Sequence, residues 1–375
     1  MKIAQIVASL ESRHGGPSRS VRGLACGLAG IGHTVGLLST VPGGDGVSKI
    51  DGTLDTRIFA RERPQAFCPS KPLRHHLLTS GYEIVHHHGL WLRTLHYARR
   101  AAVKAFAPLV ISPRGMMSEW AWNHHRFKKS LAARWVHPKA LATAAGWHVT
   151  SDGEAEDIRR LGFTQPVCVA PNGVLPPSVD EETAAIVHWR NAYPVLAARR
   201  VALFYSRFHA KKRVLELIDL WLSVPRGDWV LLLAGIPEEY TVAQLEAYVL
   251  RQGGVGRILV HDGTDAPPPY AVASLFLLPS HSENFGLVVA ESLVRGVPVL
   301  TTDATPWHKL ETVGAGHCVP WNLFAKPLAS LLAETPEALA ARGRLGSAWV
   351  SDDFSWGKTA RTLSTFYEEL REAAR

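Results

Sequence analysis

The chain of 375 residues is 46% hydrophobic and 20% charged, which excludes a disordered protein, and it is longer than one core usually fills, so two domains are expected. Its net charge of +8 is uneven: residues 1–173 carry 22 basic and 11 acidic side chains (+11), whereas the rest carries 19 and 22 (−3). The four cysteines have no metal-binding spacing and no apolar segment is long enough to span a membrane, which together predict a soluble protein of the reducing cytoplasm.

The basic first half suggests a polyanionic partner, either a nucleic acid or an anionic lipid surface. No helix-turn-helix, zinc-finger or RNA-binding signature occurs, so no nucleic acid is expected as a partner. An anionic membrane surface is the better candidate, which would place the protein in the cytoplasm or peripherally on the inner face of the plasma membrane. A solvated basic face without a partner is the alternative. A strand pattern begins directly after Met1, so no signal peptide is expected.

The first elements predict an α/β fold with a parallel sheet. Lys2–Leu10 has the pattern of a buried strand, Ser18–Ile31 that of an amphipathic helix and Thr34–Thr40 that of a second strand. A glycine-rich loop, Gly15-Gly16-Pro17, lies between the first strand and the helix, but the dinucleotide-binding pattern G-x-G-x-x-G is absent. Residues 43–80 are rich in Pro, Gly and charge, and are predicted to form loops with short elements.

Three adjacent histidines follow the next predicted strand. Tyr82–Val85 leads into His86-His87-His88, and because alternate residues of a strand face opposite ways, at most two of these side chains share a side. A zinc site and hydrogen-bonded structural histidines are the two interpretations. We favour the second and predict no metal site.

An arginine and a group of aromatic and basic residues come next. Trp91–Ala107 is predicted to be a helix and Leu109–Ser112 a strand, after which Arg114 could face an acceptor hydroxyl or a phosphate. Aromatic and basic side chains then follow closely, namely Trp120, Trp122, His124, His125, Arg126, Lys128 and Lys129. They suit sugar stacking or a lipid-diphosphate acceptor, and equally a buried amphipathic helix.

A second α/β pattern begins near residue 200. Val201–Tyr205 is predicted to be a strand that leads into a basic loop with Arg207 and Lys212, a favourable place for a diphosphate. A surface charge run is the alternative interpretation. Further strands are predicted at Trp229–Gly235, Ile258–His261, Ala271–Leu278 and Val297–Thr302, and a final helix is expected to begin at Asp352-Asp353 and to reach Ala374.

The segment Leu278–Val299 carries the most informative pattern. A strand enters a short polar loop with Glu283, and a helix over residues 286–295 contains Glu291. The free N–H groups and the dipole of a helix N-terminus attract phosphate, and Gly286 lets an anion approach the backbone. Glu291 could accept hydrogen bonds from a vicinal diol. Phosphate and diol together suggest a nucleotide sugar, although both glutamates could also be solvated surface residues.

Taken in order, these motifs resemble those of the retaining glycosyltransferases of family 4, which have the GT-B fold. The features are the Gly-Gly loop, His-x-His, Pro-Asn-Gly at 171–173, Arg-x4-Lys at 207–212, Glu-x7-Glu at 283–291 and Phe-Ser-Trp at 354–356. Ser-Pro-Arg-Gly-Met at 112–116 is similar to a motif of exopolysaccharide-type members. Ser206 and Phe208 depart from the Gly and Leu that the family has around the arginine.

The resemblance implies two Rossmann-like parallel-sheet domains that face each other across a cleft. Residues 1–175, with a returning helix at 355–375, would form the acceptor-side domain, and residues 195–354 the nucleotide-sugar domain. The family's catalytic positions correspond to His88, Arg207, Lys212 and Glu283. Its donor-binding positions correspond to Gly15, Gly16, Gly263, Asn284, Phe285, Gly286, Leu287 and Glu291. Arg114 and Trp120 are the candidate acceptor-binding residues.

The implied activity is the transfer of a hexose from a nucleotide-diphosphate sugar to a glycan or lipid-diphosphate acceptor in cell-surface polysaccharide biosynthesis. The resemblance implies retention of the anomeric configuration and a reaction without metal or other cofactor. Two alternatives remain at this point. One is a GT-B nucleotide-sugar epimerase or hydrolase. The other is a non-catalytic basic protein that binds a membrane or a nucleic acid.

Overall fold

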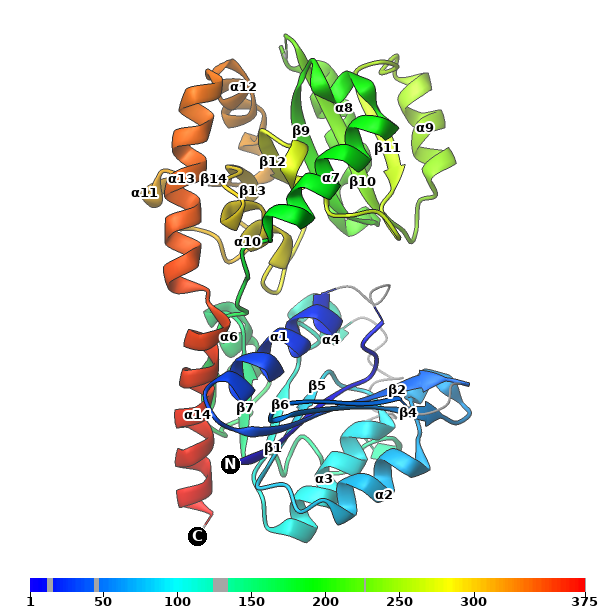
Figure 1. The fold of residues 1–375 in the computed structure, drawn as a ribbon, viewed down its shortest axis with the longest axis vertical. Coiled ribbons are helices and arrows are strands. Elements are labelled where there is room, and N and C mark those ends of the chain that lie inside the picture. Colours follow the sequence, from blue (N-terminus) through cyan, green and yellow to red (C-terminus); the bar gives the residue numbers. More distant parts are fainter. Residues whose placement is uncertain (12–15, 44–46, 124–133, 226, 375) are drawn as a thin grey trace. The chain divides into compact units, whose positions relative to one another are not determined.

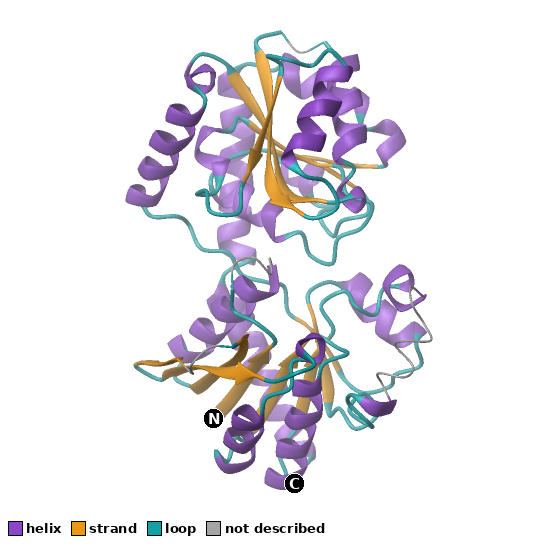
Figure 2. Ribbon diagram, turned by 90° about the vertical axis from the view of Figure 1, so that its right-hand side faces the viewer, coloured by secondary structure: helices purple, strands orange, loops and turns teal. Residues whose placement is uncertain are grey.

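The structure, a computed structural model, describes the chain except residues 12–15, 44–46, 124–133, 226 and 375 and the side chains of 47, 48, 50, 120 and 123. Two compact units are present (Figure 1): unit 1 comprises Met1–Gly173 and Phe354–Arg375, and unit 2 comprises Val174–Asp353. Each unit has a largely parallel sheet with helices on both faces (Figure 2), which confirms the predicted fold class. Within these described ranges, no helix has both the length and the apolarity needed to cross a bilayer.

Unit 1 is built on an eight-stranded sheet in the order β3-β4-β2-β1-β5-β6-β7-β8. Only β3 and β4 pair antiparallel, at one edge. The strands are β1 (Lys2–Val7), β2 (Thr34–Pro42), β3 (Val47–Asp51), β4 (Leu54–Arg61), β5 (Ile84–His88), β6 (Leu109–Ser112), β7 (Gly146–Val149) and β8 (Val167–Val169). The helices are α1 (Gly16–Gly30), α2 (Lys71–Thr79), α3 (Arg93–Ala105), α4 (Glu119–Asn123), α6 (Asp152–Arg160) and α14 (Trp356–Ala373).

The C-terminal helix α14 belongs to the core of unit 1. It packs against α1, and a Cβ atom at Gly23 would lie 2.2 Å from the Trp356 ring, so only glycine permits this close approach. Phe366, Tyr367 and Leu370 of α14 are buried in the same core, which also contains residues of β1 and α1. On the other face, α2 and α3 cover the sheet. The strand order reverses between β1 and β5, which therefore flank the switch point of unit 1.

Unit 2 contains a six-stranded parallel sheet in the order β11-β10-β9-β12-β13-β14. The strands are β9 (Arg200–Phe208), β10 (Trp229–Pro237), β11 (Ile258–Asp262), β12 (Leu275–Leu278), β13 (Val299–Thr302) and β14 (Gly316–Val319). The helices are α7 (Val179–Ala192), α8 (Val214–Ser223), α9 (Val242–Arg251), α10 (Leu287–Val294), α11 (Leu310–Val313), α12 (Ala325–Ala333) and α13 (Pro336–Asp353). Single turns of 3₁₀-helix include η4 (Ala210–Lys212) and η5 (Pro269–Val272).

The strand order of unit 2 is that of the doubly wound dinucleotide-binding fold, with the switch point between β9 and β12. The central strands are apolar at successive positions, as in Leu231–Leu233, because helices cover both faces of the sheet. Ligands of such sheets bind beyond the carboxyl ends of the strands at the switch point. The ends of β9 and β12 are therefore where a site is expected.

Several sequence predictions differ from the observed elements. Residues 43–80 contain the eight-residue strand β4 and the helix α2, which the many Pro, Gly and charged residues of this stretch concealed. The predicted strand Ala271–Leu278 begins only at Leu275, because the prolines before it favour the 3₁₀ turn η5. Asp352 and Asp353 do not cap the final helix. They end α13, and Ser355 caps α14 by accepting a hydrogen bond from the Lys358 amide.

Candidate functional site

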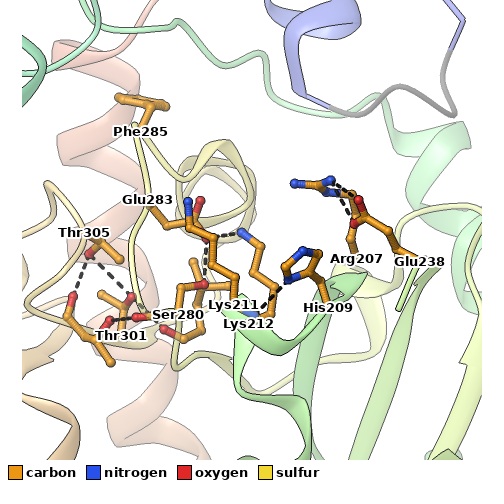
Figure 3. Close-up of polar contacts among 12 residues, drawn as sticks. Arg207, His209, Lys211, Lys212, Glu238, Ser280, Glu283, Phe285, Thr301 and Thr305 are labelled. Carbon is orange, nitrogen blue, oxygen red and sulfur yellow. Dashed lines mark hydrogen bonds and ion pairs between the residues drawn. The ribbon is translucent and has the colours of Figure 1, made fainter. Parts of the chain in front are cut away.

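The strands that flank the switch point of unit 2 both lead into segments with charged side chains. β9 extends to Phe208, so Arg207 lies in the last part of the strand and not in the predicted loop. The turn η4 follows and carries Lys211 and Lys212. β12 ends at Leu278, and the loop after it carries Ser280 and Glu283 toward the same place (Figure 3). Residues 71 positions apart thus meet at the carboxyl edge of the sheet.

Lys212 and Glu283 form a buried ion pair. The Lys212 ammonium donates a hydrogen bond to Glu283 Oε1, and the two side chains are only 9% and 13% exposed. The Ser280 hydroxyl donates to the same carboxylate oxygen at 2.7 Å. The sequence analysis assigned both charged residues to the site but did not predict that they pair with each other. We call Lys211, Lys212, Ser280 and Glu283 the ion-pair cluster.

The loop that carries Glu283 is held at three points. Thr301 Oγ1 donates to the Leu278 carbonyl at 2.9 Å, and Thr302 Oγ1 donates to the Ser280 carbonyl at 2.6 Å, both from β13. The backbone N–H of Glu283 donates to the Ala304 carbonyl at 3.0 Å. The carboxylate is therefore positioned by the fold and not by its ion pair alone.

The surroundings of Glu283 stabilise its ionised form. Burial raises the pKa of the carboxyl group, but the charge and hydrogen bond of Lys212, the Ser280 hydroxyl and the charge of Lys211 outweigh that effect, so the pKa is lowered from its ordinary value. Burial lowers the pKa of Lys211, while Glu283 opposes that shift. Glu283 is consequently a carboxylate at neutral pH that can accept hydrogen bonds but cannot donate a proton.

Arg207 also has an acidic partner, but in an exposed position. Its Nη1 atom lies 2.8 Å from both carboxylate oxygens of Glu238, and the two side chains are 49% and 40% exposed (Figure 3). Exposed pairs of this kind contribute only about 0–1 kcal/mol to stability. An anion that approached the end of β9 could therefore replace Glu238 at little cost.

The N-terminus of α10 faces the same edge of the sheet. Gly286 is the N-cap residue with φ +73°, a conformation that favours glycine, and a Cβ atom there would meet the Trp307 indole nitrogen at 3.3 Å. The Trp307 indole N–H donates to the Phe285 carbonyl at 2.6 Å and fixes the loop just before the helix. The helix begins at Leu287, directly after Asn284, Phe285 and Gly286, and no side chain caps it. Its first N–H groups can therefore receive an anion.

Glu291 lies on α10 and is oriented by a buried tyrosine. Tyr270 of η5 is 1% exposed, and its hydroxyl lies 3.0 Å from Glu291 Oε2 and 3.2 Å from the Val288 carbonyl. The Arg295 guanidinium lies over the Tyr270 ring, 5.0 Å from its centroid. The carboxylate thus has a defined position within the same short helix whose N-terminus can hold a phosphate.

Gly263 lies at the carboxyl end of β11, one strand beyond β10. Its N–H donates to the Gly235 carbonyl at 2.8 Å, and a Cβ atom would lie 3.2 Å from the Gly235 nitrogen. A larger residue would crowd this edge. The predicted contact between Gly263 and a nucleotide base remains a prediction.

In unit 1, the predicted site residues lie at the ends of β1, β5 and β6. Gly15 is outside the described residues, and Gly16 is the first residue of α1. His88 ends β5 and is 2% exposed, with Nε2 2.7 Å from Gln5 Oε1 and Nδ1 3.0 Å from Arg114 Nη2. Trp120 lies in α4, but its side chain is outside the description, as are residues 124–129.

Arg114 has an unusual backbone and unusual partners. Its φ of +55° is rare for a residue with a side chain and tends to occur at functional sites. Its Nη1 atom donates to Asn172 Oδ1 at 2.9 Å, and its Nε atom is buried with no hydrogen-bond partner among the residues that the structure describes. Burial lowers the pKa of Arg114 to about 10, so it remains a cation at neutral pH.

The three adjacent histidines divide between the two faces of the sheet, as the strand periodicity requires. His87 contacts the Gly89 carbonyl and Thr94 on one side. His86 and His88 lie on the other side with His148, and one nitrogen from each lies within 4.8 Å of the others, a spacing that a metal ion could use. Each of these ring nitrogens already has a hydrogen-bond partner, so an ion would have to displace several of them.

Sequence reasoning missed four residues of the unit 2 site. Ser280 and Lys211 bear directly on Glu283, Tyr270 orients Glu291, and Trp307 fixes the Phe285 carbonyl. Lys211 could have been predicted from the sequence, because it is a second cation directly before the predicted site residue Lys212. The two aromatic residues gave none, because their roles depend on contacts formed only in the folded sheet.

Comparison with protein families identifies both halves of the chain. Residues 15–173 match the glycosyl transferase 4-like domain, and residues 188–338 match the glycosyl transferases group 1 domain. The chain is 30% identical over 185 residues to the lipopolysaccharide core biosynthesis mannosyltransferase LpsB of Rhizobium meliloti, which is 46% of this chain and 52% of LpsB. It is 27% identical over 183 residues to the GDP-mannose:cellobiosyl-diphosphopolyprenol alpha-mannosyltransferase of Komagataeibacter xylinus, 46% of either chain. The chain spans about half the length of these curated relatives.

Solved structures share the whole fold. HepE from Anabaena, in complex with UDP and glucose, has a TM-score of 0.74 at 18% identity and covers 98% of this chain and 100% of its own. Sucrose-phosphate synthase from Thermosynechococcus elongatus has a TM-score of 0.73 at 19% identity, with 100% of both chains covered. At this level of identity the likeness shows the fold alone.

Proposed function

Since the chain belongs to the group 1 glycosyltransferases, with a GT-B fold of two Rossmann-like units, we propose that it transfers a hexose from a nucleotide-diphosphate sugar to a glycan or lipid-linked acceptor, with retention of the anomeric configuration. We propose further that this transfer is a step in cell-surface polysaccharide biosynthesis. It is supported by the activities of the two mannosyltransferase relatives, one in lipopolysaccharide core biosynthesis and one on a cellobiosyl-diphosphopolyprenol acceptor.

One observation carries the proposal. Three groups come together at the switch point of unit 2: the buried Lys212–Glu283 pair, the uncapped N-terminus of α10 and the oriented Glu291 carboxylate. All of them belong to the continuous segment 279–294 except Lys212, which lies in the neighbouring turn η4. Cations and helix N–H groups suit a diphosphate, and a fixed carboxylate one and a half turns into the helix suits the ribose hydroxyls. Glu283, held at the start of the segment, suits the hydroxyls of the transferred sugar.

In the proposed reaction, the bond between the anomeric carbon and the diphosphate oxygen breaks, and a bond from an acceptor hydroxyl oxygen to the same carbon forms. Negative charge develops on the leaving diphosphate, and Arg207, Lys211, Lys212 and the α10 N-terminus can stabilise it. The departing phosphate oxygen takes the acceptor proton, so that attack and departure occur on one face of the sugar. Glu283 Oε1 accepts hydrogen bonds from Lys212 and Ser280, which hold the carboxylate in place. We therefore assign Glu283 the role of orienting the sugar through hydrogen bonds and not that of a nucleophile.

These cations support transfer without a metal ion, since their charge could neutralise the diphosphate as a divalent ion would. A GT-B epimerase or hydrolase would use the same donor site without an acceptor. It would consume the nucleotide sugar alone, with no increase in rate on addition of a glycan. A purely binding protein has no need for a buried ion pair at the switch point, so the unit 2 site argues against it.

Thermal-shift titration with UDP, GDP, ADP and their sugars, each with and without chelator, tests the donor site. We expect a selective rise of the midpoint with one nucleotide that the chelator does not change, because a ligand of the native state stabilises it by mass action. Nuclear magnetic resonance of the product would then report the anomeric configuration. The absence of a shift with every nucleotide would remove the donor-site assignment, and a shift abolished by chelator would remove metal independence.

A further inference from the structure

The polar core of unit 1 contains a continuous series of hydrogen bonds that ends at Arg114. Its members come from β1, β5, β6, β7 and α14, and all are buried: Gln5, His86, His88, Ser112, His148 and Tyr367. We call them the histidine network. The transfer reaction as described above does not use it.

The two ends of the network determine the position of every proton within it. At one end, the Arg114 guanidinium can only donate, so His88 Nδ1 accepts and His88 Nε2–H donates to Gln5 Oε1 at 2.7 Å. The Gln5 amide nitrogen then donates to the Tyr367 hydroxyl at 3.2 Å.

At the other end, the Ala170 carbonyl can only accept, so His148 Nε2–H donates to it at 2.9 Å. His148 Nδ1 therefore accepts from the Ser112 hydroxyl at 2.7 Å, and Ser112 Oγ accepts from His86 Nε2–H at 2.8 Å. His86 Nδ1 accepts from the Tyr367 hydroxyl at 2.6 Å, which joins the two halves.

This assignment makes all three histidines neutral and gives them the same tautomer, with the proton on Nε2. A second proton on His88 would point at the donating Arg114, and one on His148 would point at the donating Ser112 hydroxyl. Burial acts in the same direction, because it lowers the pKa of His86, His88 and His148. Arg114 thus carries the positive charge at the end of the network, and the network fixes where its guanidinium points.

Among the described residues, Arg114 has no acidic partner. The hydrogen-bond acceptors described for it, His88 Nδ1 and Asn172 Oδ1, are neutral, and its buried Nε–H has no acceptor within that part of the chain. In the described part of the chain no carboxylate forms an ion pair with it: Glu154, which acts on it at longer range, accepts from the Gly115 and Thr150 N–H groups. A fixed guanidinium with neutral partners and an unused N–H at the carboxyl edge of a parallel sheet is a site for an anionic oxygen.

We propose that Arg114 binds a phosphate oxygen of the acceptor and that the histidine network positions its guanidinium for that contact. This inference deepens the proposed function and rests on it for the identity of the ligand as an acceptor. A lipid diphosphate and a sugar phosphate share the required chemistry. Arg114 touches the ligand, whereas His88, Asn172 and Tyr367 act as positioning residues.

The Arg114 Nε–H signal of the ¹⁵N-labelled full chain provides a local probe, assigned by its loss in Arg114→Lys. Geranyl diphosphate, glucose 1-phosphate and UDP are titrated separately against it. A saturable shift with geranyl diphosphate indicates a lipid diphosphate, and one with glucose 1-phosphate a sugar phosphate. A shift with UDP alone, or with none of the three, overturns the inference. Because thermal shift reports nucleotide binding independently, failure of the donor site and failure of this inference are distinguishable.

Asn172→Asp tests the charge of Arg114 without changing its shape. The new carboxylate would neutralise the guanidinium, and we expect affinity for the binding phosphate to fall about tenfold, the loss of one charge-assisted hydrogen bond. Asn191→Asp on the exposed face of α7, in unit 2, is the matched control, since it changes the net charge by the same amount without altering unit 1. Equal affinity in the two variants would contradict the proposal.

Tyr367→Phe tests the positioning role, because it removes the hydroxyl at the middle of the network. Tyr82→Phe is the matched control: this tyrosine is also buried in unit 1, and its hydroxyl contacts His76 at 3.0 Å outside the network. We expect several-fold weaker phosphate binding only in Tyr367→Phe. Ring ¹⁵N shifts should show three histidines protonated on Nε2 in the native protein, unchanged by chelator. A chelator-dependent change would mean that a metal occupies the three histidines and would overturn the network.

Discussion

The two units place polar side chains at equivalent positions but stabilise them in opposite ways. Unit 1 buries the histidine network beside its switch point, with neutral rings joined by directional hydrogen bonds. Unit 2 buries the ion-pair cluster beside its own, where Lys212 and Glu283 compensate each other. A neutral network specifies geometry and fails when it is protonated, whereas an ion pair tolerates neutral and mildly acidic pH but not the loss of one partner. The two halves should therefore respond differently to pH and to substitution.

The largest expected effect is the loss of unit 1 stability in mild acid. His86, His87, His88 and His148 have pKa values lowered by burial, that of His87 and of His148 to about 3, so the folded state stays neutral while the unfolded chain takes up protons below pH 6.5. The contribution of these neutral histidines to the free energy of unfolding is fully present above pH 6.5. It is lost as the pH falls toward their pKa values in the folded state. Each histidine contributes about 1.4 kcal/mol per pH unit, so the four together contribute roughly 6 kcal/mol per pH unit.

Hydrogen exchange of peptides from β5 and β9, followed between pH 7.5 and 5, measures this loss separately in each unit after correction for the intrinsic exchange rate. Opening should become easier in β5 as pH falls and change much less in β9. Equal destabilisation of the two strands over this range would contradict the contrast between the units.

Removal of one partner of the buried ion pair should have the next largest effect. Glu283→Ala leaves the Lys212 ammonium buried without its carboxylate, and we expect unit 2 to lose about 3–5 kcal/mol. The double variant Lys212→Met, Glu283→Leu should regain most of this stability without activity. Denaturant titration of Lys212→Met, Glu283→Leu and their double variant completes the cycle, and additive losses would show that the pair is not coupled.

The pH dependence of unit 2 has its own window. The lowered pKa of Glu283 means that its contribution is present above about pH 4.5 and is lost as pH falls below that value. The Glu283→Gln variant should therefore show a shallower loss of stability between pH 4.5 and 3 than the native protein. Identical acid profiles of the two proteins would indicate that Glu283 is not ionised in the fold.

Tyr367→Phe should have an intermediate effect on stability. It leaves the Gln5 amide and His86 Nδ1 without their partner, which costs about 1–3 kcal/mol for a buried unsatisfied group. The denaturant midpoints of Tyr367→Phe and Tyr82→Phe compare the loss of a hydroxyl inside the network with the loss of one outside it. The midpoint should fall further in Tyr367→Phe.

Arg207→Ala should change stability least. The exposed pair with Glu238 contributes at most about 1 kcal/mol, but the cation is positioned for the donor diphosphate. We expect the denaturant midpoint to stay nearly constant while nucleotide affinity falls about tenfold, the loss of one charge-assisted contact. Glu238→Gln is the informative partner, because removal of the competing carboxylate should strengthen nucleotide binding. Unchanged affinity in both variants would remove Arg207 from the donor site.

The sequence predicted most of the fold because buried parallel strands appear as apolar runs that end in polar motifs. β6 was located to the residue, and the order of the motifs identified the family. β4 was missed, since three consecutive polar residues, Asp55–Arg57, interrupt its apolar pattern and its burial is only partial. The predicted strand Ala271–Leu278 includes the last two residues of the 3₁₀ turn η5, because a short apolar run does not by itself distinguish a turn from a strand.

The site was predictable in its parts and not in its pairings. Spacing and resemblance singled out Lys212 and Glu283, but no local pattern indicates that residues 71 positions apart form an ion pair. The histidines illustrate the same limit: the strand period placed His86 and His88 on one face, whereas His148 and Tyr367 joined them only through the topology of the sheet and the return of α14. Long-range contacts therefore supplied what periodicity could not.

Hydrogen exchange in the presence of the nucleotide that gives the largest thermal shift tests the central claim, that the unit 2 switch point is the donor site. We predict protection confined to peptides that contain residues 205–213 and 279–294, where Arg207, Lys212, Glu283 and Glu291 lie. Glu291→Gln should reduce that protection without shifting its location. Protection elsewhere in the chain with none in these two segments would contradict the account.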